Sequence, residues 1–210
     1  MSAVLAPPTP VGMIPTVSAR VPLLEPRPWK WTREQYYDLG KRGFFLGKRV
    51  ELLRGEILVM CPPNEPHVTS VSLVTDVVRL AFGLGYFVRV QAPLSLGQES
   101  DPEPDVAVVA GSPRDYHNHP TSALLAIEVS DSTLFHDLTT KAELYATAGV
   151  PDYWVIDVEG RCLHVFRDPV TLPAGLGETA YSTHLTLAAT EIVSPLAAPH
   201  ATITIADLLP

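Results

Sequence analysis

The chain has little cysteine, no long apolar run and no glycine-rich phosphate loop. Its 210 residues include two cysteines, Cys61 and Cys162. So few cysteines, without a secretory signal pattern, indicate two buried thiols in a reducing compartment, and we expect neither a disulfide nor zinc on them. No stretch approaches the roughly 18 to 20 consecutive apolar residues of a membrane span. These features predict a cytoplasmic protein that does not contact a membrane.

Basic residues are also scarce. The chain has 15 Lys and Arg against 23 Asp and Glu, a formal net charge of −8. This balance argues against a protein that coats nucleic acid through a broad basic surface, because neutralisation of phosphates by Lys and Arg supplies most of the non-specific affinity for nucleic acid. A local basic groove stays compatible with it, and metal ions in a carboxylate site would offset part of the repulsion toward a phosphate substrate.

Proline is abundant and unevenly placed. Seven prolines fall in residues 1–28, where large apolar residues follow no period. Such a composition buries little surface and is typical of a flexible linker. The rest of the chain has the length of one domain with one core. We therefore expect a proline-rich tail over residues 1–28 and a single domain over residues 29–210.

The remaining sequence alternates between helical and extended patterns. A capping box at Thr32 and Gln35 and two further apolar periodicities predict helices over residues 33–39, 67–81 and 138–148, the last with Asp137 as its N-cap. Extended patterns predict strands over residues 49–53, 56–60, 86–96, 105–110, 124–130, 152–158, 162–167 and 181–187. This order favours an α/β (mixed α+β) domain with a central mixed β-sheet flanked by helices.

One acid stands inside an apolar strand pattern. Glu128 lies in the run 124–130, and an acid is seldom buried unless it is paired or holds a metal. Asp105 begins the preceding predicted strand, directly after Pro104. If the two strands are neighbours, both carboxylates converge, and they could hold Mg²⁺ or Mn²⁺, which prefer oxygen ligands.

A lysine follows on the next predicted helix. Lys141 shares a helix face with Leu138 and Tyr145, which should turn toward the sheet. An ammonium group beside metal-bound carboxylates can orient an attacking water or stabilise charge that develops on phosphorus. This combination indicates phosphodiester hydrolysis.

Four segments together resemble a known family. They are residues 49–57, which include Glu51, the Glu103-Pro104-Asp105 segment, residues 127–130 and residues 141–157. In their order and spacing the chain resembles the Uma2 family (domain of unknown function 820) of the PD-(D/E)xK nuclease superfamily, over about residues 29–210.

The resemblance implies a restriction-endonuclease-like core and a Mg²⁺-dependent (or Mn²⁺-dependent) endonuclease that acts on nucleic acid, with DNA as the expected substrate. It implies acidic, metal-binding roles for Glu51, Asp105 and Glu128, and a catalytic role for Lys141. The superfamily motif has lysine two positions after the second acid, where this chain has Ser130. Accessory site positions are implied for Gln91, His67 and Ser130.

Simpler interpretations remain open for each of these residues. Glu128 and Lys141 could form a structural ion pair, Asp105 could be a turn residue, and Glu51 a charge on a strand edge. Turn or capping roles are expected for Asp131, His136, Asp137, His117 and His119. At the level of function, the alternative is a catalytically silent nuclease-fold module that acts as a binding or assembly partner. A homodimer would suit double-strand cleavage.

Overall fold

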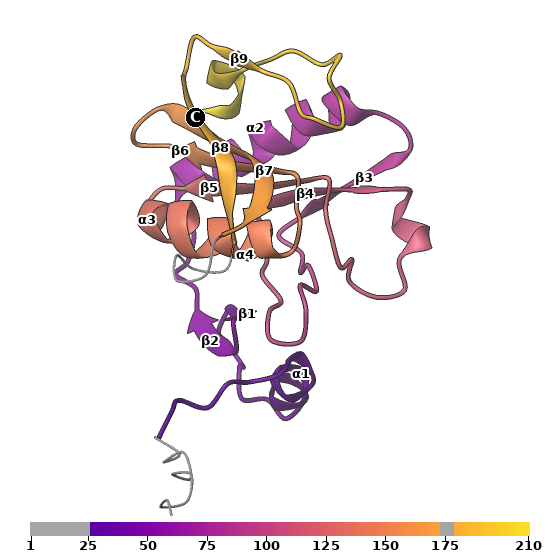
Figure 1. The fold of residues 1–210 in the computed structure, drawn as a ribbon, viewed down its shortest axis with the longest axis vertical. Coiled ribbons are helices and arrows are strands. Elements are labelled where there is room, and N and C mark those ends of the chain that lie inside the picture. The colour runs from indigo at the N-terminus through magenta and orange to yellow at the C-terminus, as the bar shows by residue number, and fades with distance from the viewer. Residues whose placement is uncertain (1–25, 173–178) are drawn as a thin grey trace, which may run out of the picture.

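A six-stranded mixed sheet forms the centre of the protein, whose computed structural model describes residues 26–172 and 179–210 (Figure 1). Its strands follow the order β3-β4-β5-β6-β7-β8, and only β5 and β6 run parallel to each other. The strands are β3 (Tyr86–Val90), β4 (Val106–Ala110), β5 (Leu125–Ser130), β6 (Asp152–Asp157), β7 (Cys162–Thr171) and β8 (Thr179–Ala188). The predicted mixed α/β class is confirmed.

Helices cover both faces of this sheet (Figure 1). On one face, α2 (Glu65–Phe82) packs Val74 and Val78 against a core that includes Trp154. The other face carries the segment between β5 and β6, which consists of α3 (Leu134–His136), a π-helical turn (Asp137–Lys141) and α4 (Ala142–Thr147). Alternate residues of β5 therefore enter different cores, and Glu128 lies on the face covered by α4.

The N-terminal part adds a small unit beside the sheet, made of α1 (Arg33–Lys41), β1 (Val50–Leu53) and β2 (Glu56–Val59) (Figure 1). The capping box at Thr32 is present, as predicted. The hairpin turn places Arg54 and Gly55 at φ 50° and 76°, which is the backbone conformation of a type I′ turn. Backbone hydrogen bonds from Gly55 to Glu99 and from Asp101 to Leu52 fix the hairpin to the loop between β3 and β4.

The C-terminal segment covers the α2 side of the sheet. It contains β9 (Ile192–Val193), β10 (Ile203–Thr204) and the 3₁₀ helix η3 (Ile205–Leu208). Ile205 and Leu208 are fully buried in the same core as α2. A second 3₁₀ turn, η1 (Pro113–Asp115), lies in the loop between β4 and β5.

Several expectations from the sequence were wrong. The strand predicted over 86–96 ends at Val90, because Gln91 adopts φ 44° and turns the chain out of the sheet. The third helical segment begins at Leu134, so Asp137 lies inside it and is no N-cap. Cys61 is exposed and Cys162 partly exposed, so neither is the buried thiol we expected.

The predicted tail over 1–28 lies mostly outside the described residues, because only Pro26 to Pro28 fall within them. Within the described part of the chain, no helix combines the length and the apolar character that crossing a membrane requires.

Candidate active site

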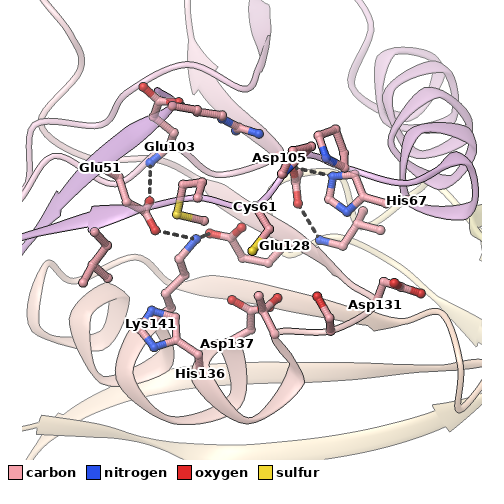
Figure 2. A pocket seen from close by; sticks show the side chains of 18 of the residues that line it. Glu51, Cys61, His67, Glu103, Asp105, Glu128, Asp131, His136, Asp137 and Lys141 are labelled. Atoms are coloured by element: carbon pink, nitrogen blue, oxygen red, sulfur yellow. Dashed lines mark hydrogen bonds and ion pairs between the residues drawn. The ribbon is translucent and has the colours of Figure 1, made fainter. Parts of the chain in front are cut away.

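A pocket of about 390 Å³ opens between the β1–β2 hairpin, the start of α2 and the end of β5 (Figure 2). The π-helical turn closes its remaining side. Apolar residues of the hairpin and of the loop before α2 line it together with six acidic side chains: Glu51, Glu103, Asp105, Glu128, Asp131 and Asp137. The predicted residues Lys141 and His67 line it as well. Segments far apart in the sequence thus bring five predicted acids and bases into one cavity.

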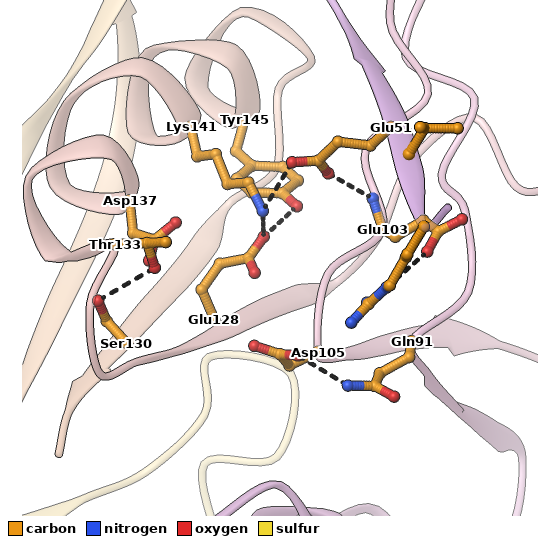
Figure 3. A network of polar contacts seen from close by, with 12 residues as sticks. Glu51, Gln91, Glu103, Asp105, Glu128, Ser130, Thr133, Asp137, Lys141 and Tyr145 are labelled. Atoms are coloured by element: carbon orange, nitrogen blue, oxygen red, sulfur yellow. Dashed lines mark hydrogen bonds and ion pairs between the residues drawn. The ribbon is translucent and has the colours of Figure 1, made fainter. Parts of the chain in front are cut away.

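Glu128 is the central buried acid of this pocket. It is 3 % exposed, and its Oε1 accepts hydrogen bonds from Lys141 Nζ at 3.0 Å and from Tyr145 Oη at 2.8 Å (Figure 3). Among the described residues, none donates a hydrogen bond to its Oε2. Burial raises the pKa of Glu128 well above its ordinary range; Lys141 opposes this shift, while Asp137, Asp105 and Glu51 reinforce it. One oxygen of the carboxylate is thus held by the protein and the other is available to a ligand.

Lys141 lies between two acids. Its Nζ is 3.0 Å from Glu128 Oε1 and 3.5 Å from Glu51 Oε1, and the side chain is 3 % exposed. It ends the π-helical turn, an irregularity often found at functional sites. Burial tends to lower the pKa of Lys141, but the negative charges of Glu128, Glu51 and Asp137 outweigh it and raise that pKa, so the amine stays protonated.

Glu51 reaches the pocket from the hairpin. Its Oε2 accepts a hydrogen bond from the backbone N–H of Glu103 at 3.2 Å (Figure 3). Its Oε1 is buried without a hydrogen-bond partner in the described chain, and faces Lys141 only at ion-pair distance. A buried oxygen in this state is costly unless another group binds it.

Asp105 is positioned by strand register. β4 and β5 are antiparallel neighbours with Val106 opposite Ile127, so Asp105 comes opposite Glu128, as the sequence suggested. Its Oδ2 accepts the backbone N–H of Val129 at 2.9 Å, and its Oδ1 accepts Gln91 Nε2 at 3.2 Å. These two hydrogen bonds therefore fix the orientation of the Asp105 carboxylate.

His67 stands beside Asp105 at the start of α2. Its Nε2 lies 3.2 Å from Asp105 Oδ1, although the alignment is not that of a hydrogen bond. The Asp105 carboxylate raises the pKa of His67 against the effect of burial. In return, burial acts to raise the pKa of Asp105, but contacts with His67, Val129 and Gln91 together hold it below the ordinary value. Asp105 is therefore held in its ionised form.

The pocket has more negative than positive charge at its buried end. Glu51, Glu128 and Asp137 are each at most 3 % exposed, and Lys141 is the ammonium that lies among them. If all three acids are ionised, two negative charges remain uncompensated. Burial raises the pKa of Asp137 too, while Lys141 and the hydroxyl groups of Thr133 and Ser130 lower it.

A second buried acid elsewhere in the chain gives a useful comparison. Asp152 is fully buried, and its two oxygens accept hydrogen bonds from Trp154 Nε1, from the guanidinium of Arg167 and from the backbone N–H of Leu196. This carboxylate joins β6, β7 and the C-terminal segment with every contact satisfied. Glu51 differs because its buried Oε1 has no hydrogen-bond donor among the described residues, and Glu128 differs because Lys141 and Tyr145 both bind the same oxygen, Oε1.

Two predicted accessory residues lie at the edge of the arrangement. Gln91 contacts Asp105 but does not line the pocket. Ser130 is buried, with its Oγ 3.4 Å from Thr133 Oγ1. The hydroxyl of Ser130 cannot replace the lysine of the superfamily motif, and the structure instead brings Lys141 to Glu128 from the helix.

Several residues in or beside the pocket were not predicted as site residues. Asp137 and Tyr145 flank Lys141 at four residues on either side, and this helical spacing was the signal that could have found them. Arg49 pairs with Glu103 at 3.4 Å at the pocket mouth, and His136 has a buried Nε2 without a hydrogen-bond partner in the described chain. Arg49 and Glu103 lie in two of the segments that carry the family resemblance, but no pattern assigned a site role to them or to His136.

The donor set fits a hard divalent cation. Asp105, Glu128 and Glu51 offer carboxylate oxygens, which Mg²⁺ and Mn²⁺ prefer. Two observations favour such an ion: the buried Oε1 of Glu51 has no hydrogen-bond partner in the described chain, and three buried acids lie around one lysine. Asp105, Glu128 and Glu51 are thus the residues that could hold it.

A mixed sheet that carries buried acids and a lysine around one pocket defines a protein with a nuclease-like fold. The sequence family Uma2, described as “Putative restriction endonuclease”, matches residues 33–206, and the chain belongs to this family. Its fold resembles the crystal structure of “a putative nuclease belonging to DUF820” from Anabaena variabilis, with TM-score 0.62 and 17 % identity over 84 % of this chain and 96 % of that one. No curated protein matches the chain.

Proposed function

We propose that this protein is a metal-dependent endonuclease that hydrolyses phosphodiester bonds of DNA in the cytoplasm. The observation that carries the proposal is the buried group of Glu51, Glu128 and Asp137 around the single ammonium of Lys141. When its acids release their protons, such a group carries more negative charge than Lys141 balances, and a divalent cation would supply the balance. Membership of the Uma2 family supports nucleic acid as the substrate.

Each residue has a role that follows from its contacts. Asp105, held ionised beside His67, and Glu128 through its free Oε2 would hold Mg²⁺ or Mn²⁺, with Glu51 completing the acidic set. When bound, the cation would supply Lewis acidity toward the phosphate. Lys141 keeps its proton and directs an ammonium into the pocket, where it would orient the attacking water or stabilise charge that develops on phosphorus. Glu128 accepts a hydrogen bond from that ammonium, and Tyr145 holds the same oxygen of Glu128 in place.

Plasmid nicking tests this proposal. The parent protein, Lys141→Met and a matched control, Lys48→Met, would be incubated with supercoiled DNA and Mn²⁺ or Mg²⁺. Lys48 is exposed, so its replacement changes the charge of the chain without touching the pocket. We expect cleavage by the parent and the control, and a loss on the order of a hundredfold in Lys141→Met. Equal cleavage by all three proteins would refute the role of Lys141.

A second candidate is a catalytically silent module that keeps the fold and binds a partner. It is favoured by the ion pairs that already engage Lys141 and by the net charge of −8, which opposes broad DNA binding. Absence of cleavage by the parent with either cation, together with a pocket that still binds Mn²⁺, would favour this candidate. Sedimentation of the parent with and without duplex DNA would also test the proposed homodimer.

A further inference from the structure

A second group of metal-ligand side chains lies at the turn between β6 and β7. Asp157 ends β6, and Cys162 and His164 begin β7 on the same side of the strand. One ligand atom from each residue lies within 4.8 Å of the other two. None of the three lines the acidic pocket. The group is thus distinct from the candidate active site.

The distances among these atoms are close to those of a shared metal. Cys162 Sγ lies 3.7 Å from His164 Nε2 and 4.0 Å from Asp157. For a tetrahedral zinc with bonds of about 2.3 Å to sulfur and about 2.0 Å to nitrogen, sulfur and nitrogen would be roughly 3.5 Å apart. Small side-chain movements would therefore complete the coordination.

Outer contacts orient two of the ligands. Nδ1 of His164 lies 3.1 Å from Thr186 Oγ1 and 3.2 Å from His184 Nε2, so the ring presents Nε2 to the cysteine. Oδ1 of Asp157 accepts the backbone N–H of Gly160 at 2.7 Å, which leaves Oδ2 for the group. Metal sites commonly fix their histidine and carboxylate ligands through such contacts.

We propose that Asp157, Cys162 and His164 form a zinc-binding site with three protein ligands and one position open to water. A thiolate and an imidazole favour zinc over magnesium, and a thiolate with a carboxylate matches the charge of a divalent ion. The competing interpretation, a cysteine nucleophile activated by histidine, is weaker because the carboxylate of Asp157 opposes formation of a thiolate when no cation is present. This site replaces our expectation that neither cysteine binds zinc, and it is independent of the proposed nuclease activity.

Cobalt absorption tests the proposal, with Co²⁺ as a coloured substitute for zinc. The full-length parent would be titrated with Co²⁺ in excess Mg²⁺, and then with Zn²⁺ as competitor. We expect a thiolate-to-cobalt charge-transfer band that saturates at one cobalt per chain, together with visible bands of a tetrahedral ion, both removed by Zn²⁺.

Four variants locate the ion. Cys162→Ser, which changes one atom, should lose the charge-transfer band, and His164→Gln should weaken cobalt binding by at least tenfold. Cys61→Ser and Asp105→Ala, which change the acidic pocket, should keep the band. No band in the parent at saturating Co²⁺ would overturn the proposal, and so would a band that persists in Cys162→Ser and disappears in Cys61→Ser. Because the Cys162→Ser result does not require His164→Gln to fold, the test remains decisive.

Discussion

Replacement of Lys141 by methionine removes the ammonium that lies between Glu51 and Glu128. Methionine keeps most of the volume of the lysine stem, so the effect on packing is small. Two buried carboxylates then face each other without their shared cation. Breaking a buried ion pair by removal of one partner costs about 3 to 5 kcal/mol.

Protonation sets an upper limit on this cost. At pH 7, a glutamate with an ordinary pKa of about 4.3 takes up a proton at a cost of roughly 3.7 kcal/mol, which limits the repulsion that Glu128 can experience. Glu128 already has a raised pKa in the parent, so its protonation costs less free energy than this. We therefore expect Lys141→Met to lower the free energy of unfolding by about 3 kcal/mol at pH 7 without metal. For a chain of this size, that is a fall in melting temperature of roughly 6 to 12 °C.

The pH dependence of this loss distinguishes charge from packing. Glu128 has a folded pKa above its unfolded value, so the folded state binds more protons than the unfolded state above that unfolded value, and stability falls as pH rises. Lys141 lowers the pKa of Glu128, so its removal raises that pKa further and makes stability fall more steeply as pH rises. The difference in melting temperature between parent and Lys141→Met should be larger at about pH 8 than at about pH 5.

Thermal melts of the parent, Lys141→Met and Lys141→Met/Glu128→Gln measure the coupling. The double variant should recover part of the lost stability because one of the two opposed charges is gone. Equal melting temperatures of parent and Lys141→Met at every pH, in the absence of metal, would refute the argument that Lys141 compensates buried acids.

Three further predictions follow from the same contacts. Mn²⁺ affinity should rise with pH and binding should release protons, because the cation displaces the proton that a raised pKa keeps on Glu128. Calorimetry in buffers of different ionisation enthalpy measures the released protons, and pH-independent binding would contradict the prediction. Tyr145→Phe should lose about 1.5 to 3 kcal/mol of unfolding free energy in denaturant melts because it removes a hydrogen bond to a buried acid, and no loss would show that the contact is weak. Asp152→Asn should lose about 3 kcal/mol of unfolding free energy, because Asp152 is a buried acid paired with Arg167. The variant should still show the parent's increase in melting temperature with Mn²⁺, and loss of that increase would place the metal at Asp152.

Much of the fold followed from local patterns. The hairpin, α1 with its capping box and the strands around Glu128 were predicted within a few residues, because turn chemistry and apolar period act over short distances. The convergence of Asp105 and Glu128 required their two strands to be neighbours. β4 and β5 are antiparallel neighbours, and Asp105 comes opposite Glu128. The family resemblance and the mixed α/β class are confirmed.

The errors arose where tertiary contacts override local preference. Apolar residues continue past Val90, but the N–H of Gln91 bonds to the carbonyl of Asp105 and the chain leaves the sheet. Asp137 resembles a helix cap in sequence, yet the π-helical turn buries it beside Lys141. The partners of Cys162 come from β6 and β7, and the pairing of these two strands brings them together. The roles of Glu51, Asp105, Glu128 and Lys141 in catalysis stay predictions.

Anomalous X-ray diffraction from crystals soaked in Mn²⁺ tests the central claim most directly. The account predicts a manganese peak in the acidic pocket, with oxygens of Asp105 and Glu128 at bonding distance and Glu51 turned toward the ion, and no such peak in crystals of Asp105→Ala. A well-ordered pocket without manganese at saturating concentration, with Lys141 still bound to both glutamates, would contradict the claim that these acids form a metal site.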